Sequence, residues 1–156
     1  MEIRQARTDD AAAVAALLGE LGYPTSEEEA AFRLERLREE PQTLMLVVDI
    51  DGSVAALGGI RSEWPLEHGE PWGRLIVLVV REQHRGRGIG ARLLRALEAE
   101  ATSRGCVGVV LTSGNHRPEA HAFYERCGYE ATGKRFAKVL SSLDYARSSS
   151  RPRSSA

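Results

Sequence analysis

Two segments near the N-terminus have the hydrophobic spacing of amphipathic helices. The first is predicted from residue 8 or 9 to about residue 21, because apolar residues recur there at i, i+3, i+4 and i+7: Val14, Leu17, Leu18 and Leu21. A second helix is predicted to end near Glu39, and its start carries the capping-box pattern, Thr25-Ser26 followed by Glu28-Glu29. The Glu and Arg residues of this second helix indicate a solvated face.

The pattern then changes to that of β-strands. The run LMLVVDI (44–50), the turn signal Asp51-Gly52 and the run VAALGGI (54–60) predict a hairpin. Residues 61–73 are rich in Pro, Gly and Trp and are predicted to form an irregular loop. The next run, RLIVLVV (74–80), is continuously apolar, which is typical of a strand covered on both faces.

The second half of the chain alternates between helix and strand. A helix is predicted from Ile89 to about residue 103, then a strand over 107–113, then a helix that begins at Pro118 and ends at Gly128. The segments YEATGK and FAKVLSSL (129–134 and 136–143) are predicted to form a last, weaker pair of strands. The order predicts an α+β fold, with a central mixed sheet of six to seven strands flanked by about four helices.

Composition limits the class of protein. The 156 residues suffice for one domain, predicted over 1–145, and the polar, Ser- and Arg-rich tail over 146–156 is predicted to be disordered. The net charge of −1 favours neither a nucleic-acid partner nor a membrane surface. There is no apolar run of ~18 residues and no signal-peptide pattern, so we expect a cytoplasmic protein. Cys106 and Cys127 lack metal-ligand spacing and are expected to be reduced core thiols.

The segment with the clearest chemistry is Arg85-Gly86-Arg87-Gly88-Ile89-Gly90, between a buried strand and an amphipathic helix. Its glycines allow close approach of a ligand, and the helix that begins here offers unpaired N–H groups to an anion such as a pyrophosphate. The spacing differs from the dinucleotide fingerprint G-x-G-x-x-G, and the GK[ST] of a P-loop is absent. A glycine-rich turn with solvated arginines is the plain alternative.

This segment closely resembles the acetyl-CoA-binding motif of the GNAT superfamily of N-acetyltransferases, (Arg/Gln)-x-x-Gly-x-(Gly/Ala), through Arg85, Gly88 and Gly90. Downstream, NHRPEAHAFYERCGYEATGK resembles the second motif of the same superfamily, with its Phe-Tyr-Glu and following Gly-Tyr. The resemblance extends over about residues 1–140. One departure is Glu82, which stands where many members have proline.

The resemblance implies acetyl-CoA as co-substrate and assigns residues to it. Pantetheine is expected in a gap beside the central strand, along Leu78, Val79 and Val80, with Asn115 as a further contact. The pyrophosphate is expected on the residues of the turn, backed by Arg85: Gly86, Arg87, Gly88, Ile89, Gly90 and Ala91. We expect no metal, because His116 and His121, at i and i+5, would lie on different helix faces.

The implied mechanism is direct attack of an uncharged amine on the thioester. The backbone N–H of Leu78 or Val79 is expected to stabilise the oxyanion. Tyr124 is the candidate general acid for the leaving thiolate, since tyrosine and thiol have reference pKa values of ~10 and ~8.5; a packing role is the alternative. Glu70, just before the central strand, is the candidate general base among several Glu and His residues.

The sequence leaves other functions open. A non-catalytic acyl-CoA-binding regulator on the same fold is the main alternative, and another acyl-CoA is a further one. The acceptor is expected to be a small-molecule or peptide amine, and the resemblance allows a homodimer. The RGRG segment and basic tail do not indicate nucleic-acid binding, because they lack interleaved aromatic residues.

Overall fold

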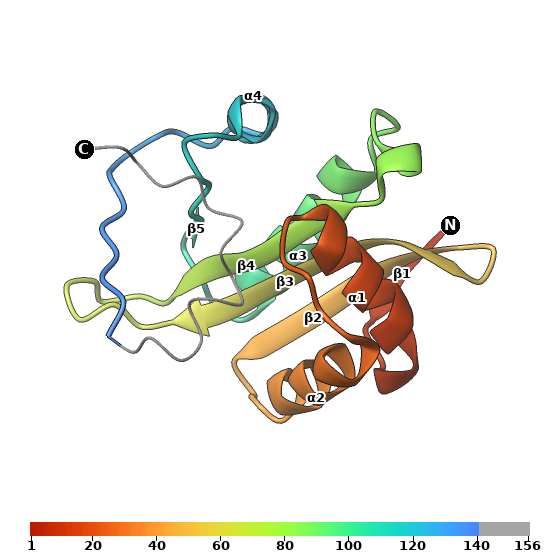
Figure 1. Cartoon of the computed structure of the whole chain (residues 1–156). Coiled ribbons are helices and arrows are strands. Elements are labelled where there is room, and N and C mark those ends of the chain that lie inside the picture. Colours follow the sequence, from red (N-terminus) through yellow and green to blue (C-terminus); the bar gives the residue numbers. More distant parts are fainter. Residues whose placement is uncertain (141–156) are drawn as a thin grey trace.

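The computed structural model describes residues 1–140, which form one five-stranded sheet with helices on both faces (Figure 1). The strands follow one another in the order β1-β2-β3-β4-β5; the first four are antiparallel neighbours, and β5 runs parallel to β4. Their bounds are β1 Glu2–Gln5, β2 Thr43–Ile50, β3 Ser53–Glu63, β4 Trp72–Val80 and β5 Val109–Val110.

The two faces of the sheet carry different helices. The short 3-10 helix η1 (Thr8–Asp10), α1 (Ala11–Glu20) and α2 (Glu27–Arg38) cover one face, and α3 (Ile89–Ser103) covers the other (Figure 1). A second 3-10 helix, η2 (Glu82–His84), follows β4, and α4 (Pro118–Arg126) follows β5. The predicted α+β fold with four helices is therefore confirmed.

Alternation along the strands explains why both faces are buried. In β2, Leu44, Leu46 and Val48 join the core under α3, whereas Val47 joins the core under α1 and α2. Successive strand side chains point to opposite faces, so a strand that is covered twice needs apolar residues at every position. The continuous apolar runs of the sequence have this cause.

Local signals place several element ends. Ser26 caps α2 as predicted: its Oγ accepts from the Glu29 N–H at 3.1 Å, and the Glu29 carboxylate accepts from the Ser26 N–H at 2.9 Å. Pro118 is the first residue of α4. At the β2–β3 hairpin, Asp51 and Gly52 both have positive φ, of 52° and 82°, as the two central residues of a type I′ turn require.

The prediction of six to seven strands is wrong, because the sheet has five. The strand expected over 107–113 is paired only at Val109 and Val110, so it leaves little edge for another strand. Residues 129–140 form no strand, and Phe136 and Leu140 are about nine-tenths exposed. The end of the predicted last strand and the tail over 146–156 lie outside the described residues. Within residues 1–140, none of the helices has the length and apolar character that a bilayer crossing needs.

Candidate active site

The pairing between β4 and β5 ends well before β4 does, and we call the region beside the unpaired part of β4 the wedge. The two strands are paired only at Gly73–Val109 and Arg74–Val110, although β4 continues to Val80. Against β3, Gly59 lies opposite Val77 and Ile60 opposite Leu75, so Ile76 is an extra residue in β4. Such a bulge bends its strand and re-aims neighbouring side chains. It lies at the point where β4 leaves its parallel neighbour.

The direction of the β4 amides follows from the hydrogen bonds to β3. The Arg81 N–H donates to the Ala55 carbonyl at 2.9 Å. Bonded and non-bonded pairs alternate in an antiparallel ladder, so Val79, paired with Leu57, also bonds to β3. The N–H and carbonyl of Leu78 therefore point away from β3 and into the wedge.

The glycine-rich turn closes the end of the wedge. Gly86 and Gly88 have positive φ, of 73° and 74°, and Gly88 is the N-cap residue of α3. No side chain caps this helix, and its first hydrogen bond runs from the Arg92 N–H to the Gly88 carbonyl, so the N–H groups of residues 89–91 have no partner within the helix. A Cβ on Gly86 or Gly88 would meet no atom within 4 Å, so the space over the turn is open.

Gly90 has a different role in the same turn. A Cβ there would lie 3.4 Å from Val80 Cγ2 and 3.5 Å from the ring of Phe123. Both distances are ordinary van der Waals contacts, so an alanine would just fit there, whereas a larger side chain would collide with β4 and α4. Gly90 therefore serves packing, whereas Gly86 and Gly88 serve the backbone conformation.

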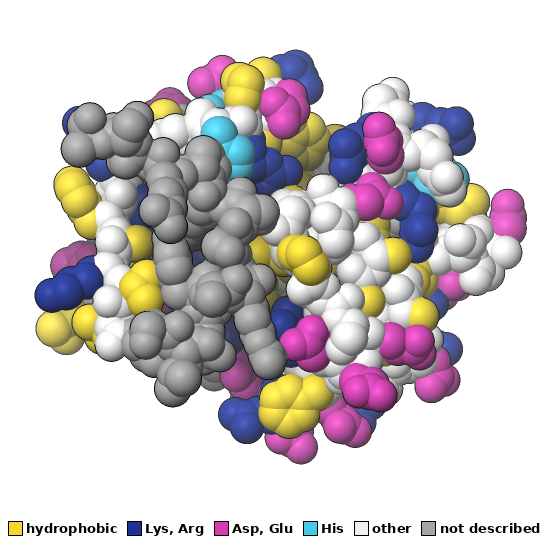
Figure 2. Space-filling view, in the orientation of Figure 1, with side chains coloured by type: hydrophobic (Ala, Val, Ile, Leu, Met, Phe, Trp, Pro, Cys, Tyr) yellow, Lys and Arg dark blue, Asp and Glu magenta, His cyan; other side chains and the backbone are white. Residues whose placement is uncertain are grey.

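Three arginines give this end of the molecule positive charge. The Arg85 Nε donates to the Val80 carbonyl at 2.9 Å, so Arg85 is held behind the turn. Arg87 and Arg92 have no carboxylate within 4.0 Å among residues 1–140. Figure 2 shows basic side chains around the connection between β4 and α3, with acidic ones among them.

Glu20, at the end of α1, ties the turn to the opposite helix layer. Its carboxylate accepts from the Glu82 N–H at 2.8 Å and lies 3.5 Å from the Arg85 guanidinium. Sequence reasoning did not identify Glu20, because its partners lie about sixty residues further along the chain and leave no local pattern. Glu82 stands where proline is common in the family that the sequence resembles. Proline has no N–H and could not make this hydrogen bond to Glu20.

Tyr124 lies on α4, in edge-to-face contact with Phe123 and Tyr129 at ring distances of 5.2 and 5.8 Å. Burial raises the pKa of Tyr124 above its usual value, so the phenol stays protonated at neutral pH. No hydrogen bond to its hydroxyl is found among residues 1–140. The hydroxyl of Tyr129, in contrast, donates to the Glu98 carboxylate at 2.8 Å.

Of the predicted site residues, Glu70 lies apart from the wedge and Asn115 lies at its margin. Glu70 is exposed in the loop before β4, and the strand from Trp72 to Leu78 alone spans roughly 20 Å. The structure does not bring Glu70 together with the other predicted residues. Asn115 is exposed in a turn closed by the hydrogen bond from the Arg117 N–H to the Gly114 carbonyl, between β5 and α4.

Neither the histidines nor the acidic residues form a metal centre in the described part of the chain. Among residues 1–140, no three His, Cys, Asp or Glu side chains are grouped so that they could bind a metal ion. His121, on α4, instead donates its Nε2–H to the Gly114 carbonyl at 2.9 Å.

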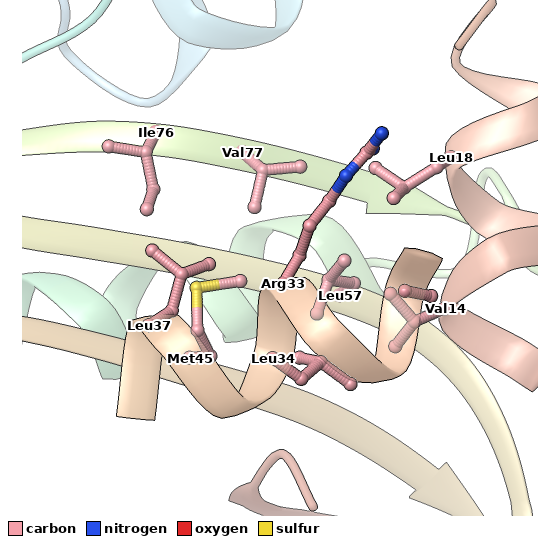
Figure 3. A pocket seen from close by; sticks show the side chains of 10 residues that line it. Val14, Leu18, Arg33, Leu34, Leu37, Met45, Leu57, Ile76 and Val77 are labelled. Carbon is pink, nitrogen blue, oxygen red and sulfur yellow. The ribbon is translucent and has the colours of Figure 1, made fainter. Parts of the chain in front are cut away.

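A cavity of about 190 Å³ lies on the other face of β4, between the sheet and helices α1 and α2 (Figure 3). The bulge directs both Ile76 and Val77 toward it, whereas Leu75 and Leu78 face the core under α3. Arg33 is the one charged side chain in its wall as the described residues form it. The other lining residues are apolar: Val14, Leu18, Ala30, Leu34, Leu37, Met45, Leu57, Ile76 and Val77.

Comparison with known proteins identifies the class. The family model described as the Acetyltransferase (GNAT) family matches residues 11–129, which is well over half of the chain. The chain therefore belongs to the GNAT family of acetyltransferases. Its family and its similarity to known N-acetyltransferases show that it is an acetyl-CoA-dependent N-acetyltransferase.

The relatives are themselves N-acetyltransferases. An aminoalkylphosphonate N-acetyltransferase of Salmonella typhimurium is 31% identical over 144 residues, covering 89% of this chain and 91% of the relative. An aminoglycoside N(6′)-acetyltransferase of Stenotrophomonas maltophilia is 31% identical over 134 residues, covering 83% and 86%. The crystal structure of glucosamine-6-phosphate N-acetyltransferase from Arabidopsis thaliana is similar with a TM-score of 0.78 at 25% identity, covering 90% of this chain and 98% of that one.

Proposed function

We propose that this enzyme moves the acetyl group of acetyl-CoA to a primary amine by direct attack, with the thioester held in the wedge between β4 and β5. One observation carries the proposal. The free amide edge of β4 at Leu78 leads within ten residues to the open, uncapped N-terminus of α3 at Gly88. A thioester arm and a pyrophosphate joined in one molecule need these two features in this order.

The turn would hold the pyrophosphate. Unpaired N–H groups at a helix N-terminus, together with the helix dipole, favour a phosphate there. The N–H groups of residues 86–91 supply the donors, and Arg87 adds charge from a side chain without a carboxylate partner in the described residues. Arg85 supports the turn from behind through Val80 and Glu20.

Leu78 would contact the thioester and Val80 would lie along the pantetheine arm. The alternation of hydrogen bonds favours the Leu78 N–H over that of Val79 as the oxyanion donor, because Val79 bonds to β3. An N–H directed at the developing negative charge is worth most in a site that excludes water. Asn115, between β5 and α4, would meet the same arm from the other side of the wedge.

Tyr124 would act as the general acid. The amine nitrogen forms a bond to the thioester carbon, the C–S bond breaks, and its electron pair goes to sulfur. The Tyr124 hydroxyl then gives its proton to this thiolate. The attacking nitrogen releases a proton to solvent, and the Tyr124 phenolate takes one up from solvent, which restores the enzyme. Burial keeps the Tyr124 phenol protonated before the step, as a general acid must be.

Two variants with a matched design test this assignment. In Tyr124→Phe we expect kcat to fall by about 10²–10⁴-fold, with acetyl-CoA affinity retained. Tyr129→Phe is the control: it removes a hydroxyl from the adjacent ring that is already bonded to Glu98, so kcat should stay near the wild-type value. The readout is thiol release for kcat and calorimetry for binding. Equal kcat values in wild type and Tyr124→Phe would remove the proposed role.

Small amines are the proposed acceptors, in line with the names of the relatives. The panel should contain an aminoalkylphosphonate, an aminoglycoside, glucosamine 6-phosphate, a polyamine and a peptide with a free amine. Turnover of any of these amines supports the proposed acetyl transfer. Tight acetyl-CoA binding without thiol release on any amine would favour the regulator instead.

A further inference from the structure

The cavity beneath β4 and the proposed thioester site adjoin one short stretch of that strand. Its wall includes Ile76 and Val77, and the next residue, Leu78, points its amide into the wedge. Side chains and backbone of one short stretch thus connect the cavity to the wedge. This inference rests on the proposed function, which places the thioester at Leu78.

The size of the cavity limits the acceptor. An apolar cavity of about 150 Å³ accommodates benzene, and pockets for drug-sized ligands begin near 300 Å³. At about 190 Å³, the cavity under β4 suits a body of a few carbon atoms. The cavity opens to solvent on one side, so it would enclose only part of a multi-ring acceptor.

The charge at the cavity comes from Arg33 alone in the described part of the chain. Figure 3 shows its side chain extending from α2 between Val77 and Leu18. Its NH1 donates to Thr25 Oγ1 at 3.3 Å, in the connection between α1 and α2, and no carboxylate of residues 1–140 lies within 4.0 Å of the guanidinium. Within residues 1–140, most of its donors therefore have no partner, at the mouth of an otherwise apolar site.

We propose that the acceptor is a compact amine with a short apolar body and an anionic group, and that Arg33 is the specificity-determining residue that binds this anion. A guanidinium presents several N–H donors in a planar fork that matches a carboxylate or a phosphonate. The apolar wall receives the carbon chain. A second cationic group on the acceptor would be repelled.

The test compares substrates that differ in charge but hardly in shape. The series consists of ω-amino acids with two to five methylene groups, their primary amides, the corresponding aminoalkylphosphonates, and diamines of the same lengths. At the best chain length we expect kcat/KM for an anionic substrate to exceed that for the amide by about 10–100-fold, the effect of a hydrogen bond to a charged group. The phosphonate arm decides which of the two anions is preferred.

Variants assign the effect to Arg33. Arg33→Gln should lower kcat/KM for the anionic substrate to the value for the amide, and Arg33→Glu should favour the diamine. Arg36→Gln is the control, because Arg36 is an exposed cation on the same helix and does not line the cavity. Thermal unfolding and acetyl-CoA affinity should be unchanged in all three.

The outcomes separate this inference from the proposed function. If wild type uses the amide as well as the acid, or if Arg33→Gln slows all substrates equally, the role of Arg33 is wrong while the acetyltransferase stands. If acetyl-CoA binds but no amine in either panel releases thiol, the proposed function itself fails, and the acceptor inference with it.

Discussion

Gly88 provides a strong test of the anion site, because the chain contains a matched control for its backbone. Gly88 has φ 74° and Gly105, at the other end of α3, has φ 80°. A Cβ at either position would meet no protein atom within 4 Å. Substitution by alanine therefore costs only the left-handed conformation, about 1–2 kcal/mol in each case.

The two variants should agree in stability and differ in ligand binding. A cost of 1–2 kcal/mol corresponds to a fall in Tm of about 3–6 °C for a protein of this size. In Gly88→Ala the new methyl group also occupies the open space where the pyrophosphate is expected. The loss of one hydrogen bond to a charged phosphate, about 2 kcal/mol, would weaken acetyl-CoA binding roughly 30-fold. Gly105→Ala should bind acetyl-CoA as wild type does.

Differential scanning calorimetry gives the two Tm values, and isothermal titration gives the two dissociation constants. Equal acetyl-CoA affinity in the two variants would refute the placement of the pyrophosphate on this turn. An unchanged Tm in both would refute the backbone argument, whatever happened to binding.

Two further predictions concern residues outside the wedge. Glu20→Ala removes the acceptor of the Glu82 N–H and should raise KM for acetyl-CoA about 10-fold, because the turn is then held less firmly. Glu20→Gln keeps an acceptor and should raise KM less. Initial rates over a range of acetyl-CoA concentrations measure both values. Hydrogen bonds from the Arg4 guanidinium hold the pKa of Asp10 below its usual value in the folded state. The Asp10 carboxylate therefore contributes its full stability above the unfolded pKa of ~3.9, and this stability is lost as the pH falls from there through the folded pKa. Urea unfolding between pH 7 and pH 2 should show this loss in wild type and a smaller one in Asp10→Asn, and equal slopes in the two proteins would contradict it.

Features with short-range causes were predictable from the sequence. The cap at Ser26, the hairpin at Asp51-Gly52 and the start of α4 at Pro118 each depend on a few adjacent residues. The same holds for the glycine-rich turn, since positive φ at Gly86 and Gly88 is a local requirement of the backbone. These local patterns sufficed to predict the fold class and the place of the glycine-rich turn.

Features that depend on a distant partner appeared only in the tertiary structure. The length of β5 was overestimated because strand propensity does not show where a neighbour turns away, and β4 leaves β5 after Arg74, beside the bulge at Ile76. The hydrogen bond from the Glu82 N–H to Glu20 joins the end of α1 to the residues that follow β4. The sequence pattern had assigned Arg33 to a solvated face. Arg33 is indeed exposed, but only the packing of α1 and α2 on the sheet creates the cavity beside it. Hydrophobic periodicity reports which side of an element is buried, whereas cavities and long-range hydrogen bonds depend on how the elements pack together.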